Sequence, residues 1–292
     1  MKKLLIGSLF LLACAVLFGL PFENMRYTYY NDGIGLYSFE FSQGEIILQD
    51  WQKYEDQKEE DSIELPGYPG LYCKVFKDTY NLIRQDGFLI VKTKKRSFIC
   101  LFKNSDICVL VEIDSSPIST KRVYWGINSS IIQKTKQKTS GIFTPEWDSK
   151  IKVSTFLPGT TKGGIKYKPP FGRIEYGAIW IEDGKGKGIG EWIEIDNSQT
   201  TDKMLFLNGV ILPGSPSSFI ENGRIKKLQI DFDGFSQIAE LADTPNPQVV
   251  FLDRKACNTK IRVTILEVYD GAKYMNCGLS FLGTLSTDMT LK

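Results

Sequence analysis

Apolar and polar residues alternate along much of the C-terminal half of the chain. Ile193 and Ile195 alternate with polar neighbours, and the same period of two recurs at residues 228–232 and 261–265. Successive side chains of a strand point to opposite faces of a sheet, so this pattern predicts strands with one buried face. No amphipathic helix separates these strands, which disfavours a parallel α/β fold. We therefore expect an all-β chain with a β-sandwich over residues 143–292.

The N-terminal half contains short apolar runs of strand length. The runs at 88–93, 97–102 and 107–113 are separated by short polar turns. Such a series is typical of an antiparallel meander. It predicts a smaller antiparallel β domain over residues 24–132. Residues 133–142 begin with a lysine-rich run that has no apolar residue, which indicates a linker.

The chain has no histidine. This composition excludes histidine-ligated zinc, serine or cysteine nucleophiles activated by imidazole, and any imidazole general base. Hydrolysis by a pair of carboxylates remains open. The formal net charge is only +2, from 36 basic and 34 acidic residues. It gives no reason to expect a nucleic-acid partner.

The chain begins like an exported protein. Lys2 and Lys3 precede an uninterrupted apolar run over residues 4–20, which predicts a secretory signal at 1–20. The residues before Cys14 resemble a lipobox, a signal-peptidase site also fits there, and the run is just long enough for an uncleaved anchor. The expected location is periplasmic, secreted or lipid-anchored at the surface. Membrane contact is expected only through this segment.

Five cysteines remain when Cys14 is set aside. Because the number is odd, at least one cannot pair within the chain. Cys257 and Cys277 are candidates for a disulfide, and buried free thiols are the alternative. No Cys-x-x-Cys spacing supports a redox or metal site.

A glycine-paced loop between two tryptophans is the most distinctive stretch. Trp180 precedes Gly-Lys-Gly-Lys-Gly-Ile-Gly at 184–190, and Trp192 follows in a strand pattern. A phosphate loop should open a helix, so nucleotide binding is disfavoured. Gly188 and Gly190 instead predict positive φ in a tight connection. We expect Trp192 in the core, whereas Trp180 could fill the core or stack on a sugar.

Several motifs occur in an order and at spacings that resemble a known family. They are Ser154-Thr-Phe-Leu-Pro, Gly163-Gly-Ile-Lys-Tyr-Lys-Pro, Trp180-Ile-Glu, Lys185-Gly-Lys-Gly-Ile-Gly-Glu-Trp-Ile-Glu, Asn208-Gly, Asn222-Gly-Arg-Ile-Lys-Lys-Leu-Gln-Ile-Asp-Phe and Ile261-Arg-Val-Thr-Ile-Leu-Glu-Val-Tyr-Asp-Gly-Ala-Lys-Tyr. Over about residues 145–285, the chain resembles the discoidin-like domain found beside bacterial NAD glycohydrolases, also called the NAD-glycohydrolase-type translocation or glycan-binding domain. The resemblance implies a galactose-binding-like jelly-roll sandwich. Its loops would bind a glycan or another surface ligand, and its role would be recognition rather than catalysis.

Two loops depart from the family pattern. Lys187 stands where the family has an acid, and Met275 and Asn276 follow Tyr274 where the family has aspartates. If those acids hold calcium or sugar hydroxyls in relatives, this chain has a weakened or altered site. We therefore expect no cofactor, with only weak support for structural calcium and none for another metal. With Lys185, the loop would favour anionic ligands.

The candidate ligand-binding residues lie on these two loops: Trp180, Glu182, Lys185, Lys187, Tyr269, Lys273, Tyr274 and Asn276. No catalytic residue is assigned. Asp233-Gly234 is expected to be a hairpin turn rather than part of a calcium loop.

The predicted function is that of a non-enzymatic exported protein that binds a glycan or a surface or envelope protein. The alternatives are an NAD glycohydrolase, a glycosidase, and a structural envelope protein.

Overall fold

The computed structural model is all-β over the residues that it describes, which confirms the predicted class. These are residues 24–31, 34–53, 62–64, 71–85, 87–113, 123–134, 151–158, 179–184, 186–212, 215–287 and 291. The short helices α2 (Ser129–Lys134) and α3 (Ser218–Glu221) occur among them. No helix in this part of the chain is long and apolar enough to cross a membrane. The predicted signal with Cys14 lies outside the described residues, as does Lys185.

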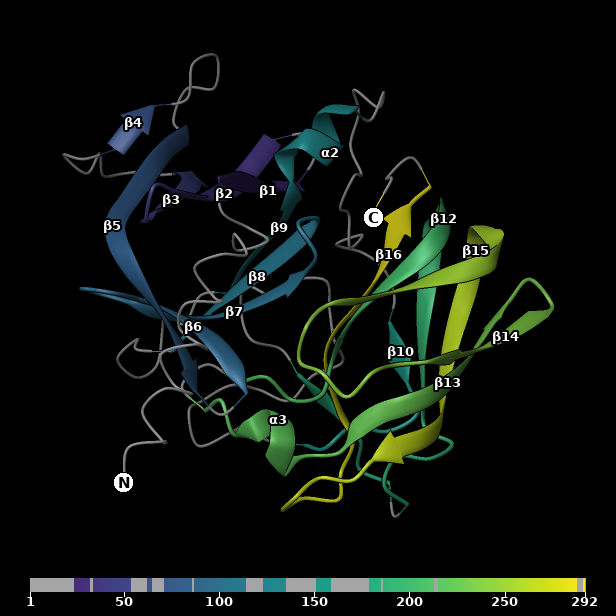
Figure 1. Cartoon of the computed structure of the whole chain (residues 1–292). Helices are drawn as coiled ribbons and strands as arrows, with labels where there is room; N and C mark the ends of the chain where they lie inside the picture. The colour runs from purple at the N-terminus through teal and green to yellow at the C-terminus, as the bar shows by residue number, and fades with distance from the viewer. Residues whose placement is uncertain are drawn as a thin grey trace, which may run out of the picture.

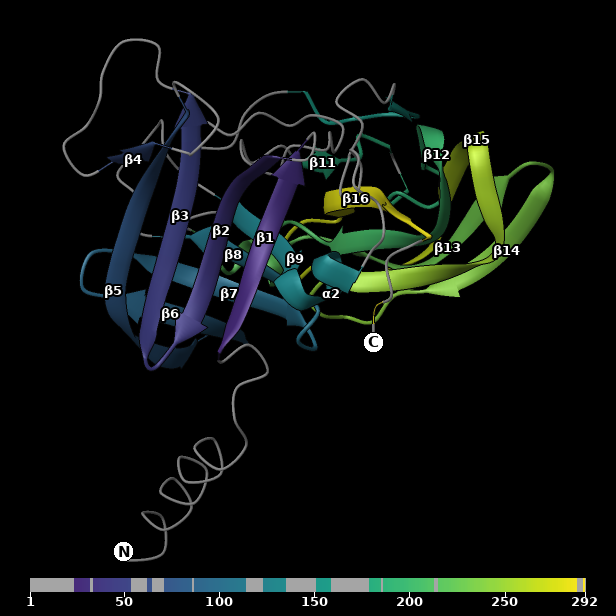
Figure 2. The ribbon, with the colours of Figure 1, turned by 90° about the horizontal axis from the view of Figure 1, so that it is seen from above.

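The N-terminal strands form a closed antiparallel barrel. They are β1 (Met25–Asn31), β2 (Ile34–Ser42), β3 (Glu45–Lys53), β4 (Ser62–Glu64), β5 (Leu71–Gln85), β6 (Phe88–Thr93), β7 (Ser97–Lys103), β8 (Ile107–Glu112) and β9 (Val123–Asn128). Each strand pairs with the next, except that β3 pairs with β5, and β9 pairs back with β1. β4 is added to β5 beside this ring. Figure 2 shows β5, β3, β2 and β1 side by side, with β6 to β8 behind them.

The predicted meander is therefore confirmed, and its closure leaves few unpaired strand edges. The domain boundaries stay predictions, because residues 135–150 lie outside the described part of the chain.

Aromatic and thiol side chains fill the inside of the barrel. Tyr27 lies opposite Phe39 and stacks on it, with ring centroids 5.2 Å apart. The Sγ atoms of Cys100 and Cys108 lie 3.7 Å apart in the same core. The hydroxyl of Tyr27 is buried without a hydrogen-bond partner among the described residues, and burial raises its pKa. The cross-strand registers thus give a packed interior.

The barrel and the C-terminal strands share one apolar cluster. All six residues of β8 are buried, so this strand is covered on both faces. Phe88 of β6 packs edge-to-face on Phe219 of α3, with ring centroids 6.2 Å apart. Leu205, Leu207 and Phe281 belong to the same buried cluster as the barrel core. The barrel therefore covers an outer face of the C-terminal sandwich.

The C-terminal strands form the predicted sandwich. They are β10 (Lys152–Val153), β11 (Trp180–Ile181), β12 (Trp192–Asn208), β13 (Arg224–Phe232), β14 (Phe235–Glu240), β15 (Gln248–Tyr269) and β16 (Gly278–Ser286). The long strands β12 and β15 pair twice, with irregular register between Asn197 and Lys203. The first half of β12 pairs with the C-terminal part of β15, which also pairs with β13, and β14 follows beside β13 (Figure 1). The second half of β12 lies between the N-terminal part of β15 and β16.

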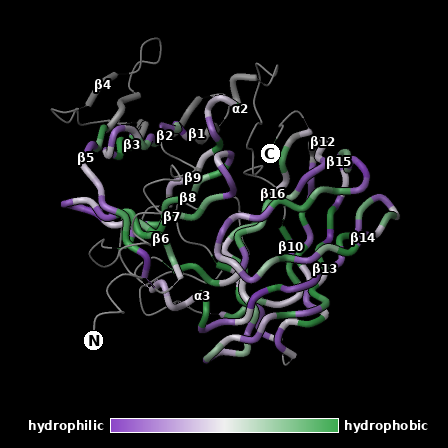
Figure 3. Tube along the Cα trace, viewed as in Figure 1, coloured by the Kyte–Doolittle hydropathy of each residue, from purple (hydrophilic) through white to green (hydrophobic). Residues whose placement is uncertain are grey.

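Alternation along these strands fills the core between the two layers. Ile193 and Ile195 are buried there, as predicted, together with Met204 and Phe206 from the second half of β12. Hydrophilic and hydrophobic colours alternate along β13 and β15 in Figure 3.

The turn between β13 and β14 is the predicted two-residue hairpin. Asp233 has φ 50° and Gly234 has φ 72°, and Phe232 pairs directly with Phe235. Positive φ at both central residues defines the turn type that suits the twist of a hairpin.

The predicted disulfide between Cys257 and Cys277 is absent, because both thiols are free. Cys257 is exposed in the middle of β15, whereas Cys277 is buried in the loop before β16. The twelve residues from Cys257 to Tyr269 cover roughly 40 Å of strand contour, whereas a disulfide needs Cα atoms within about 7 Å.

Thiol labelling of the native chain should follow burial. Cys257 is expected to react fully with iodoacetamide, and Cys100, Cys108 and Cys277 only after unfolding. Burial raises the pKa of Cys108 and Cys277, which disfavours the reactive thiolate. Peptide mapping by mass spectrometry measures each site. A peptide linking Cys257 to Cys277 would contradict the arrangement.

Candidate functional site

Three segments form one end of the sandwich, which we call the loop end. They are residues 182–191 before β12, residues 218–223 with α3, and residues 270–277 between β15 and β16. The backbone N–H of Gly223 donates to the carbonyl of Asn276 at 2.9 Å. The loop end lies at the lower edge of the sandwich in Figure 1, beside α3.

Glu182 holds two of these segments together from inside. Its side chain is fully buried, and its carboxylate accepts from the backbone N–H of Cys277 at 3.1 Å and of Gly184 at 2.5 Å. Asn276 Nδ2 donates to the carbonyl of Glu182 at 3.0 Å. Burial raises the pKa of Glu182, although the two backbone hydrogen bonds oppose that shift. Glu182 is thus an internal anchor, and its expected role as a ligand contact is wrong.

The raised pKa of Glu182 predicts a pH dependence of stability. Below its usual value of 4.5, the carboxyl is protonated in both the folded and the unfolded chain. As the pH rises past that value, the unfolded chain ionises first, so the free energy of unfolding falls until the folded pKa is passed. Urea denaturation across this range should show the native chain losing stability relative to Glu182→Gln, since the other titrating groups are common to both proteins. An equal pH slope in both proteins would contradict the prediction.

The structure places Trp180 in the core and Trp192 outside it, so the expectation for Trp192 is wrong and the open question for Trp180 is decided in favour of the core. Trp180 is fully buried in the sandwich core, and its Nε1 donates to the carbonyl of Thr155 at 2.8 Å, so it cannot stack on a sugar. Trp192 is half-buried, with the Arg262 guanidinium 4.2 Å from its ring centroid. The reason is the strand period, because Ile193 takes the core-facing position and Trp192 must face the other way.

The described lysine of the glycine loop is not free for an anion. Lys187 Nζ lies 2.7 Å from Asp270 Oδ1, so its charge is already paired. Gly188 and Gly190 have φ 84° and 87°, which confirms the predicted positive φ. A Cβ on Gly188 would lie 2.9 Å from both Glu182 Cγ and Cys277 Cβ. Gly188 therefore permits close packing of the two loops, whereas Gly190 meets nothing within 4 Å and is required only for its positive φ.

The loop after β15 presents the exposed candidates. The hydroxyl of Tyr269 donates to the carbonyl of Leu241 at 3.1 Å, so this tyrosine anchors the loop. Lys273 is exposed, with Nζ 5.0 Å from the ring centroid of Tyr274. Tyr274 is 45% exposed and Met275 is 63% exposed. Lys273 Nζ also lies 3.9 Å from Glu221 Oε2. Among the predicted residues that the structure describes, Tyr274 therefore presents the most open aromatic side chain to a ligand.

Sequence reasoning missed two apolar residues of this end. Ile189 is 55% exposed in the glycine loop, and Ile220 is 48% exposed on α3. The carbonyl of Ile220 accepts from the N–H of Ala272 at 2.9 Å, so α3 lies directly beside the loop of Tyr274. An isoleucine inside a glycine run was the available signal for Ile189.

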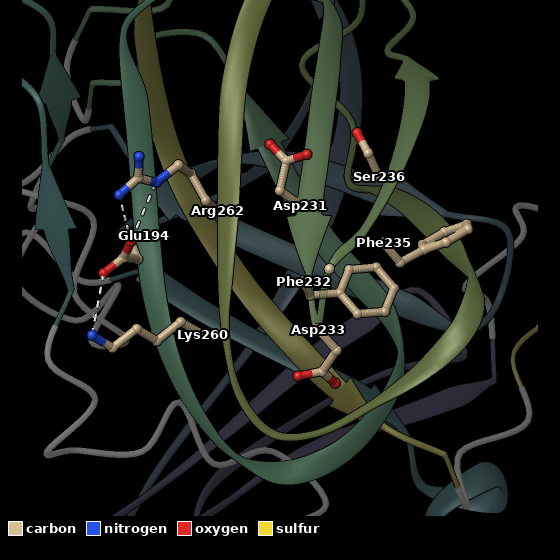
Figure 4. A pocket seen from close by; sticks show the side chains of 9 residues that line it. Glu194, Asp231, Phe232, Asp233, Phe235, Ser236, Lys260 and Arg262 are labelled. Carbon is tan, nitrogen blue, oxygen red and sulfur yellow. Dashed lines mark hydrogen bonds and ion pairs between the residues drawn. The ribbon is translucent and has the colours of Figure 1, made fainter.

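A hollow of about 470 Å³ lies elsewhere on the sandwich (Figure 4). It is lined by Glu194, Asp231, Phe232, Asp233, Gly234, Phe235, Ser236, Lys260 and Arg262. The sequence pattern predicts only a turn at 231–234, because the other lining residues come from strands that are distant in the sequence. Among the described residues, no group of three or more His, Cys, Asp or Glu side chains could hold a metal ion. The calcium expectation stays a prediction.

Residues 160–282 match the family described as the NAD glycohydrolase translocation F5/8 type C domain. This segment is a discoidin-like domain of that family. The matched residues lie within the range of about 145–285 inferred from the motifs, so the resemblance is confirmed. No curated protein matches the chain.

Solved structures similar to the chain include three sugar-binding domains. CpGH89CBM32-5 from Clostridium perfringens, in complex with GalNAc-β-1,3-galactose, is 17% identical and covers 49% of this chain and 98% of its own, with a TM-score of 0.36. The family 32 module of C. perfringens NanJ, in complex with galactose, is 11% identical over 48% of this chain and 95% of its own, with a TM-score of 0.34. The lectin binding domain of Lectinolysin, complexed with Lewis b, is 11% identical and covers 50% of this chain and 99% of its own, with a TM-score of 0.33.

Proposed function

We propose that the discoidin-like domain binds a glycan through its loop end, and that the chain is a non-catalytic exported protein. The observation that carries the proposal is the exposed ring of Tyr274 on a fixed loop. The N–H groups of Lys273 and Tyr274 both donate to the carbonyl of Glu221, at 3.1 and 2.8 Å. A ring held in place loses little conformational entropy when a sugar packs its C–H face on it.

The surrounding side chains support recognition rather than turnover. The carboxylate of Glu182 faces inward, Asp270 is paired with Lys187, and Glu191 accepts from the hydroxyls of Ser154 and Thr155. A glycosidase needs two carboxylates facing a common ligand, and these three are engaged in holding the loops. The absence of histidine from the whole chain removes the commonest general base. Export rests on the apolar leader at residues 4–20.

A glycan array with the full chain tests the proposal. The sugars bound by the C. perfringens modules, galactose and GalNAc-β-1,3-galactose, are the first probes. We expect binding, and a loss of at least about tenfold in Tyr274→Ala, since packing on an aromatic ring contributes roughly 1–2 kcal/mol.

The matched control is Phe251→Ala, which removes another exposed ring, on β15 and outside the loop end. Equal losses in both variants would contradict a site at the loop end. Release of nicotinamide from NAD by the full chain would contradict the non-catalytic role.

A further inference from the structure

We propose that the hollow of Figure 4 is a second saccharide-binding site, for a neutral pyranose, on the open face of the sandwich. It does not rest on the site proposed at the loop end. Its floor is a row of polar side chains across three neighbouring strands. Asp231 of β13 pairs in register with Arg262 of β15, and Arg262 pairs with Glu194 of β12. Because paired residues project from the same face, these three side chains stand side by side.

The side chain of Arg262 is oriented by contacts within the protein. Its Nε and Nη2 lie 3.2 and 2.7 Å from Glu194 Oε2, and the ring of Trp192 lies 4.2 Å from the guanidinium carbon. Lys260 approaches the other oxygen of Glu194 at 3.8 Å. Nη1 of Arg262 makes no hydrogen bond within the described residues. A rigid guanidinium with a free donor suits a hydroxyl group.

Acceptors stand on the opposite side of the hollow. Gln229 Nε2 donates to both oxygens of Asp231, at 2.8 and 3.0 Å, which orients the carboxylate and leaves lone pairs unused. The side chains of Asp233 and Ser236 make no hydrogen bond in the part of the chain that the structure describes. Both are exposed: Asp233 lies in the hairpin turn, and Ser236 lies on β14 opposite Asp231 (Figure 4). Donor and acceptors therefore line the same hollow.

An aromatic ring borders the polar groups. Phe235 is half-buried and packs edge-to-face on the buried Phe232, with ring centroids 5.5 Å apart. The Arg254 guanidinium lies 4.7 Å from the centroid of Phe235, so the ring is held by two neighbours. Because Phe235 pairs with the core residue Phe232, its ring projects from the core face of the sheet and borders the hollow without lying in the polar row. A partly exposed ring at the border offers an apolar contact to a ligand with hydroxyl edges.

The charges of the lining favour a neutral ligand. Three carboxylates, those of Glu194, Asp231 and Asp233, face the two cations Lys260 and Arg262. The carboxylates would repel a polyanion, and the two cations would repel a polycation. Vicinal hydroxyls of a neutral sugar can instead donate to Asp231 and accept from Arg262. A volume of about 470 Å³ is within the usual range for a small-molecule site.

The test first eliminates binding at the loop end by replacing Tyr274. Saturation-transfer NMR is run on full-length Tyr274→Ala with three probes, the methyl glycosides of galactose, glucose and mannose. We expect at least one probe to receive saturation. Adding Asp231→Asn, which keeps an acceptor for Gln229, should weaken that binding at least about tenfold. Adding Arg262→Lys should have a similar effect, because lysine keeps the charge but lacks the two-pronged guanidinium donor.

The matched control is Asp253→Asn, which removes an exposed carboxylate of β15 that does not line the hollow. Thermal unfolding confirms that each variant is folded. No saturation of any probe in Tyr274→Ala overturns the second site, as does an unchanged signal in Asp231→Asn. If the hollow variants alone abolish array binding and Tyr274→Ala does not, the loop-end proposal fails while this one stands.

Discussion

Trp180→Ala is expected to lower the free energy of unfolding by about 3–5 kcal/mol. Trp180 is fully buried in the sandwich core, with 0% of its surface accessible to solvent. Its replacement removes a large ring from between the layers and leaves the carbonyl of Thr155 without the Nε1 donor at 2.8 Å. The cavity term adds to the lost transfer energy, because close-packed neighbours relax only partly. Urea denaturation gives the change directly.

Trp192→Ala is the matched control, because it removes the same side chain at the other end of the glycine loop. Trp192 is half-buried and packs under Arg262, so we expect a loss of only about 1–2 kcal/mol. A larger loss for Trp192 than for Trp180 would contradict the placement of both rings.

Arg224→Ala is expected to cost about 3 kcal/mol and to loosen the loop end. The Arg224 side chain is buried, and its Nε and Nη2 donate to the two carboxylate oxygens of Asp243 at 2.9 and 2.8 Å. Its Nη1 donates to the carbonyls of Asn222 and Asp270, both at 2.9 Å. One guanidinium therefore joins α3, the start of β13 and the loop that carries Tyr274. Removing it leaves these acceptors without their donor.

Two measurements separate these effects. Arg224→Lys keeps the positive charge but cannot form the fork, so it should retain less than half of the stabilisation. Hydrogen exchange at the amides of residues 272–276 should become faster in Arg224→Ala, because global and local opening both increase. Arg254→Ala, on the exposed part of β15, is the control. Unchanged exchange in Arg224→Ala would mean that other contacts hold the loop.

Local patterns in the sequence were sufficient to predict much of the fold. Period-two alternation predicted the buried face of β12 through Ile193 and Ile195, and the Asp233-Gly234 pair predicted the hairpin turn. Closure of the barrel was not predictable from such patterns, because β1 pairs with β9 across about a hundred residues of chain. The second half of β12 breaks the alternation, since the barrel covers the face that carries Leu205 and Leu207.

The site was less predictable than the fold. The same alternation that places Ile193 in the core should have placed Trp192 outside it, and the family pattern overrode that argument. Burial of Glu182 depends on the N–H of Cys277, which lies 95 residues further along the chain. The hollow was missed because Glu194, Asp231 and Arg262 meet only through strand register. Residue types alone show none of these contacts.

Calorimetric titration of the strongest array glycan into three full-length proteins tests the central claim most directly. The proteins are the native chain, Tyr274→Ala and Tyr274→Phe. Recognition by an exposed ring on a fixed loop predicts at least about tenfold weaker binding for Tyr274→Ala and nearly native binding for Tyr274→Phe. Native affinity in Tyr274→Ala, or no glycan bound by the native chain, would contradict it.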